Sequence, residues 1–106
     1  MDVIKMAGVA QFKSPKGITA RKLLENQSFV LMNLLLKPGE VLEKHKTPVD
    51  VFFYVVKGKG FVQIGDQESP VEATDIVFSP KGIPHGLRAL PDDEFQVLVV
   101  KNPLSD

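Results

Sequence analysis

Residues 38–58 of the chain read PGEVLEKHKTPVDVFFYVVKG, from Pro38 to Gly58. The stretch has Gly and Pro at its start, one histidine, His45, near its middle and an apolar run of six residues before its final Gly. Gly and Pro mark turns, and a short run of Val and aromatic residues is typical of a β-strand. The stretch therefore predicts a strand at 51–56 between two connections.

The same pattern continues on both sides of this stretch. Further strand-like runs cover residues 30–36, 61–64, 76–78 and 95–100, and residues 20–25 are interpreted as a strand although they could also form a helix. The connections between the runs carry Gly, Pro or Asp, at 37–39, 57–60, 65–66, 79–82 and 90–93. Repeated short strands with closely spaced turns predict a sandwich or a barrel. Residues 11–17 are expected to form a loop, and residues 1–17 an N-terminal arm.

The bulk composition fits one globular domain spanning residues 1–106. Of the 106 residues 43% are hydrophobic, and 13 basic residues balance 13 acidic ones. A neutral chain without a basic stripe is not expected to bind nucleic acid. The absence of cysteine excludes disulfides and thiolate metal ligands. Neither a signal peptide nor a membrane-spanning segment is found, so we expect a cytoplasmic protein.

Two runs, Val51–Val56 and Val97–Val100, are apolar on both faces of the expected strand. A strand of this kind must be covered on both sides. In so short a chain a second subunit can supply the outer cover, and the sequence therefore predicts a homodimer. Strand alternation places Val51, Phe53 and Val55 on one face and Tyr54 on the other.

In two of its segments the chain resembles the cupin superfamily. The first cupin motif reads G-x5-H-x-H-x3-4-E-x6-G, and residues 38–58 place Gly39, His45 and Gly58 in register with it. The second motif reads G-x5-P-x-G-x2-H-x3-N, and residues 74–89 place Pro80, Gly82 and His85 in register. The resemblance implies an all-β fold, the cupin-type double-stranded β-helix or jelly-roll barrel, in a small single-domain member.

The remaining motif positions depart from the family pattern. Thr47 stands at the second histidine position and Val51 at the glutamate position. Thr74 replaces the opening glycine of the second motif, and Ala89 replaces its closing asparagine. The resemblance therefore implies a degenerate metal-ligand set, of which only His45 and His85 are carried over.

Two interpretations of the histidine pair stay open. In the first, His45 and His85 hold a divalent transition metal (Zn, Fe, Ni, Cu or Mn), since imidazole is a common ligand of such metals. Strand alternation then places Glu43 and Val41 inward with His45, which makes Glu43 a candidate third ligand and acid–base group, and Thr47 a further oxygen donor. In the second, the pocket is free of metal and the histidines act as acid–base or hydrogen-bonding groups.

Three functions follow from these interpretations. The first is a cupin that binds a small molecule in a histidine-containing barrel pocket, with or without a metal. The second is a metal-dependent enzyme, a dioxygenase, isomerase or lyase acting on a small organic substrate. The third is a metal-free structural or regulatory dimer. Asn33 and Gln96, the polar residues within apolar runs, are further candidates for the pocket lining.

Overall fold

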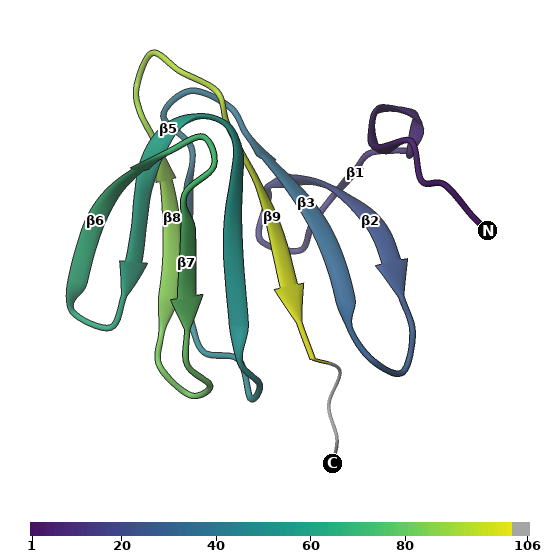
Figure 1. The fold of residues 1–106 in the computed structure, drawn as a ribbon. Helices are drawn as coiled ribbons and strands as arrows, with labels where there is room; N and C mark the ends of the chain where they lie inside the picture. Colours follow the sequence, from purple (N-terminus) through teal and green to yellow (C-terminus); the bar gives the residue numbers. More distant parts are fainter. Residues whose placement is uncertain (103–106) are drawn as a thin grey trace.

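The computed structural model describes residues 1–102, which form a nearly all-β domain (Figure 1). A 3₁₀ turn at Met6–Gly8 is followed by strands β1 (Phe12–Lys13), β2 (Thr19–Glu25), β3 (Val30–Leu36), β4 (Val41–His45), β5 (Val51–Ile64), β6 (Gln67–Glu72), β7 (Ile76–Ser79), β8 (His85–Ala89) and β9 (Phe95–Lys101). None of the helices among these residues is long and apolar enough to cross a membrane.

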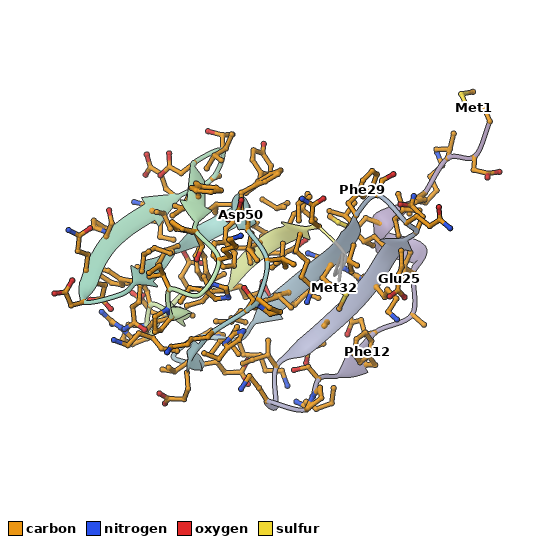
Figure 2. The ribbon with its side chains drawn as sticks, turned by 90° about the horizontal axis from the view of Figure 1, so that it is seen from below. Met1, Phe12, Glu25, Phe29, Met32 and Asp50 are labelled. Atoms are coloured by element: carbon orange, nitrogen blue, oxygen red, sulfur yellow. The ribbon has the colours of Figure 1, made fainter. Side chains whose placement is uncertain are left out.

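The strands form two antiparallel sheets that enclose the core between them. One sheet has the order β1-β2-β3-β9-β5-β7, and the other joins β4 to β8, β8 to β5 and β5 to β6. Figure 1 shows the curled arrangement, with the β5–β6 hairpin at one side and β1–β2–β3 at the other. The N-terminal residues extend beyond the strands, and Met1 projects away from the body of the domain in Figure 2.

Strand β5 is longer than the sequence pattern indicates. The runs at 51–56 and 61–64 are a single strand, and the turn predicted at 57–60 is absent. A register shift between Val55 and Lys57, together with a positive φ of 82° at Gly58, bends the strand there. The first half of β5 pairs with β7 and β9, and the second half pairs with β6 and β8. Glycine and a bulge thus let one strand pass from one sheet to the other rather than ending it.

Three further strands of the structure were not expected from the sequence pattern. Strands β6 and β8 lie in segments that lack a long apolar run, and β1 lies inside the stretch expected to be a loop. Strand β6 reads QESPVE and is exposed at every position except Val71, as expected for an edge strand that tolerates a proline. The strand expected at 20–25 is confirmed as β2.

The core lies between the sheets and follows strand alternation. In β5 the side chains of Val51, Phe53 and Val55 are buried, whereas Phe52 is exposed and Tyr54 is partly exposed. Phe53 and Phe95 are the largest fully buried side chains. Alternation in β9 likewise buries Phe95 and Val97. Apolar surface removed from water in this way stabilises the fold by about 25 cal/mol per Å².

Candidate functional site

The two histidines of the chain meet at one end of the space between the sheets. His45 closes β4 and His85 opens β8, and the two residues are register partners in the antiparallel β4–β8 pair. Their ring centroids are 4.7 Å apart and the rings meet edge to face. Partners in an antiparallel pair point to the same side of the sheet, so the pairing itself brings the imidazoles together.

His85 is the more constrained of the two. Its side chain is only 3% exposed, its ring meets Phe53 edge to face at 5.2 Å, and its Nδ1 shares a 2.8 Å hydrogen bond with the buried Ser79 hydroxyl. Burial, followed by the charges of His45 and Lys101, lowers the pKa of His85 from 6.5 to about 4. His85 is therefore a neutral imidazole at pH 7, oriented by Ser79.

Two loops hold this pair in place. The Gly82 amide donates to the Thr47 carbonyl at 2.9 Å, and the Lys81 amide donates to the Asp50 carboxylate at 2.9 Å. The turn before β8 is thereby tied to the loop that follows β4. The motif residue Gly82 has a positive φ of 78°, a conformation that glycine adopts without steric cost.

His45 is partly exposed, and its Nδ1 lies 3.2 Å from the Glu43 carbonyl oxygen. The side chain of Glu43 is exposed and does not point to the same face as His45. Leu42 and His45 are three positions apart along β4, but their partners Leu87 and His85 are two positions apart, so one extra residue forms a bulge. The bulge turns Leu42 inward with His45 and leaves Val41 and Glu43 exposed. The expectation that Glu43 and Val41 face inward is wrong, because it assumed unbroken alternation.

The side chains at the other motif positions are engaged with another residue, apolar or exposed. The Thr47 hydroxyl donates to the Val49 carbonyl at 3.1 Å, in the loop after β4. Val51 is buried in the core, and Ala89 is buried at the far end of β8. Thr74 is exposed and has a φ of 76°, so it retains the left-handed backbone that the family glycine would adopt more readily.

A cavity of about 240 Å³ lies beside the histidines, between the two sheets. Its lining comes from the loop before β2 and from β3, β4, β5, β8 and β9, and consists of Ser14, Pro15, Lys16, Ile18, Met32, Leu34, Leu42, His45, Phe53, His85, Val99 and Lys101. The wall is largely apolar, with the imidazoles and two lysines as its strongest polar groups. A larger hollow of about 420 Å³ next to β6 contains neither histidine.

Sequence reasoning placed Asn33 and Gln96 as candidates for the pocket lining, and the cavity contains neither. Asn33 is fully buried, and its amide donates to the Val97 carbonyl at 3.2 Å and to Gln96 at 3.3 Å. Its Oδ1 accepts a hydrogen bond from Arg21 at 3.0 Å. These bonds satisfy the buried amide on the side of β3 opposite to the cavity-lining Met32 and Leu34.

Ser79 and Lys101 are functional candidates that sequence reasoning missed. Alternation from Phe95 through Val97 and Val99 puts Lys101 on the inner face of β9, and this signal was available in the sequence. The contact between Ser79 and His85 joins the end of β7 to the start of β8, and it depends on the path of the loop between these strands.

The donor set does not fit the resident divalent metal that the resemblance implies. Catalytic zinc sites have three protein ligands and an open position. The chain has two histidines and no cysteine, and in residues 1–102 no three His, Cys, Asp or Glu side chains lie close enough together to hold a metal ion. The Glu43 carboxylate is turned away by the bulge, and the Thr47 hydroxyl is engaged with Val49.

Comparison with known proteins agrees with this architecture. The chain is 29% identical over 87 residues to oxalate decarboxylase OxdC of Bacillus subtilis (strain 168), a match that covers 77% of the chain and 23% of that protein. The chain thus spans about a quarter of the length of this curated relative.

Solved structures with the same fold include proteins that are described as having different activities. The polyketide cyclase RemF of Streptomyces resistomycificus aligns with a TM-score of 0.87 at 23% identity, over 95% of this chain and 78% of that one. A predicted oxalate decarboxylase from Thermotoga maritima aligns with a TM-score of 0.88 at 18% identity, over 97% of this chain and 100% of that one. At these identities the likeness establishes the fold alone.

The family model described as "Cupin domain" matches residues 32–101, which is well over half of the chain. The matched segment starts in β3 and ends with β9, so it includes both motifs and both histidines. The fold, the motif residues and this match agree, and the chain belongs to the cupin family.

Proposed function

We propose that this cupin binds a small organic molecule in the cavity beside His45 and His85. The observation that carries the proposal is the cavity itself, an apolar space of about 240 Å³ with both histidines in its wall. Ligand sites are typically concave and mostly apolar, with a few polar groups that orient the ligand. The volume lies below the range of about 300–1,000 Å³ of drug-sized pockets, so the ligand is expected to be small.

The histidines supply the orienting groups. Ser79 engages the Nδ1 of His85, which leaves Nε2 as the ring nitrogen for a ligand. A neutral imidazole offers one donor and one acceptor, so this nitrogen pairs with a ligand hydroxyl or carbonyl according to its tautomer. His45 borders the same cavity and is the more exposed of the two. No step of this binding uses a metal.

The test is a thermal-shift screen with small organic acids, amides, alcohols and amines, followed by calorimetric titration of the compounds that stabilise the protein. A ligand of the native state raises stability by mass action. We expect His45→Gln to weaken the response and Glu43→Gln, an exposed neighbour on the same strand, to preserve it. An unchanged response in His45→Gln, or a loss in Glu43→Gln, would contradict the assignment.

Catalysis remains the alternative function, and the same compounds test it. The curated relative is named for the decarboxylation of oxalate, and a neutral imidazole beside a second histidine can move a proton. Any stabilising compound is therefore followed by NMR for conversion in the presence of the protein. Turnover that disappears in His85→Gln would favour a lyase, isomerase or oxygenase over a binding protein.

We also propose that the domain forms a homodimer through the outer face of its larger sheet. Register pairs align one apolar row across five strands, made of Phe78, Phe52, Val100, Leu31 and Leu24. Phe78 is 59% exposed and Phe52 is 40% exposed. Exposed apolar patches of this kind mark interaction sites, and a two-fold copy of the same face would cover this one.

Light scattering after size exclusion tests the dimer. The wild-type protein should elute with twice the chain mass, and Phe78→Lys should give monomer because a charge would be buried at the interface. Phe29→Lys is the matched control, since Phe29 is exposed to a similar degree to Phe52 but lies in the turn between β2 and β3. A monomeric wild-type protein at micromolar concentration would rule out this dimer.

A further inference from the structure

The cavity beside the histidines carries an uneven distribution of charge. Among its lining residues are two lysines, Lys16 and Lys101, and no aspartate or glutamate. The chain as a whole has equal numbers of acidic and basic residues, so this local excess of positive charge is a property of the cavity and not of the composition. A concave site lined by one sign of charge, with low-dielectric walls, concentrates ions of the opposite sign.

Lys101 has the more informative position. It stands on the inner face of β9, which is otherwise apolar, and it is only partly exposed. Its register partners are Val30 on β3 and Val51 on β5. A lysine ammonium is favoured in such a place when water or an anion solvates it.

The ion pairs recorded within residues 1–102 join Lys22 to Glu25, Lys57 to Glu94 and Arg88 to Glu68. Neither of the cavity lysines takes part in them. The charge of Lys101 acts on His85. After burial and the charge of His45, it is the third cause of the lowered pKa of His85. The lysine and the neutral imidazole thus face the same space, one as a cation and the other as a neutral hydrogen-bonding group.

We propose that the cavity selects a small organic carboxylate, with Lys101 pairing with the carboxylate group and the apolar wall of Met32, Leu34 and Val99 contacting the rest of the ligand. The inference rests on the proposed binding function and specifies its ligand class. Lys16, in the loop before β2, adds a second positive charge at the cavity. A charge-assisted hydrogen bond in a partly enclosed site is stronger than a neutral one, which is the basis of the selectivity.

Matched pairs of probes test this selectivity by calorimetric titration. Benzoate is compared with benzamide and hexanoate with hexanamide, since each pair has the same shape and differs in charge. With the wild-type protein we expect each carboxylate to bind at least about tenfold more tightly than its amide. With Lys101→Met, the preference should fall to near unity while amide binding persists. Added salt should weaken carboxylate binding and leave amide binding unchanged.

Lys57→Met is the matched control, because Lys57 is exposed and pairs with Glu94 away from the cavity. It should keep the wild-type preference. Circular dichroism and the thermal midpoint establish that Lys101→Met is folded. Equal binding of carboxylates and amides by the wild-type protein, or an unchanged preference in Lys101→Met, overturns the ligand class while leaving the pocket assignment intact. Failure of all four probes to bind would overturn both.

Discussion

Acidification should destabilise this protein through His85. The pKa of His85 is lowered from 6.5 to about 4 in the folded state, primarily by burial. Between these two pH values His85 binds a proton in the unfolded chain but not in the folded one. The free energy of unfolding therefore falls as the pH falls. Each pKa unit corresponds to about 1.4 kcal/mol, and the full shift to about 3 kcal/mol. Because the ring borders a cavity that water can enter, we expect a loss of about 2 kcal/mol.

Urea unfolding at a series of pH values measures this loss. The variant His85→Gln keeps a group that can hydrogen-bond to Ser79 and removes the titration. A difference in overall stability between His85→Gln and the wild-type protein does not affect the test, because the comparison uses only the slope of the unfolding free energy against pH. The wild-type curve should fall more steeply than the variant curve between about pH 6.5 and about pH 4.

Parallel curves for the two proteins over that range would refute the reasoning, since His85 would then titrate normally in the fold. A second variant tests the cause of the shift. His45→Gln removes the charge on the register partner of His85, which is one cause of the lowered pKa. NMR titration should therefore find the pKa of His85 raised towards its ordinary value. An unchanged pKa would mean that burial and the charge of Lys101 produce the shift without a contribution from His45.

Three further predictions concern the backbone and metal content. Gly58→Ala should cost about 3 kcal/mol in urea unfolding, because its φ is positive and a Cβ would lie 1.8 Å from the Glu94 carbonyl oxygen; a cost below about 1 kcal/mol would contradict this. Thr74→Gly should leave stability unchanged or raise it by up to about 1 kcal/mol by relieving a φ of 76°. The neighbouring Ala73→Gly should instead lower stability by about 0.5 kcal/mol, and an equal loss at both positions would argue against strain. After loading with zinc, iron, copper, nickel or manganese and dialysis, mass spectrometry should find well under one equivalent of metal; stoichiometric metal that is lost when both histidines are replaced by alanine would contradict the donor-set argument.

The position of each histidine in the motif was predictable from sequence, and the identity of its neighbours was not. The resemblance to the two cupin motifs, with Gly39 and Pro80 in register, implies that His45 and His85 are pocket residues. The third partner assigned from alternation, Glu43, faces solvent because a one-residue bulge reverses the faces of β4. A bulge arises where two strands pair, and the pattern of one strand alone does not contain it.

Local physics sufficed for much of the fold. Turn residues and short apolar runs identified an all-β chain, and a period of two grouped Val51, Phe53 and Val55 on one strand face, which is the buried face. The same period contains the signal that places Lys101 on the inner face of β9, although Lys101 was not among the residues predicted for the pocket. These features depend on φ preferences and on alternation, which act within a few residues.

Contacts distant in sequence were decided by tertiary structure alone. The fusion of two predicted strands into β5 depends on pairing with β6, β8 and β9, because those ladders keep residues 57–60 within the strand where Gly and Lys would otherwise form a turn. The charge excess of the cavity likewise depends on strands that meet only after the sheets close. The sequence by itself determined the all-β class, most of the apolar strands and the motif positions of the two histidines. The fold determined their partners, because a side chain's neighbours across a barrel are set by register and closure rather than by local preference.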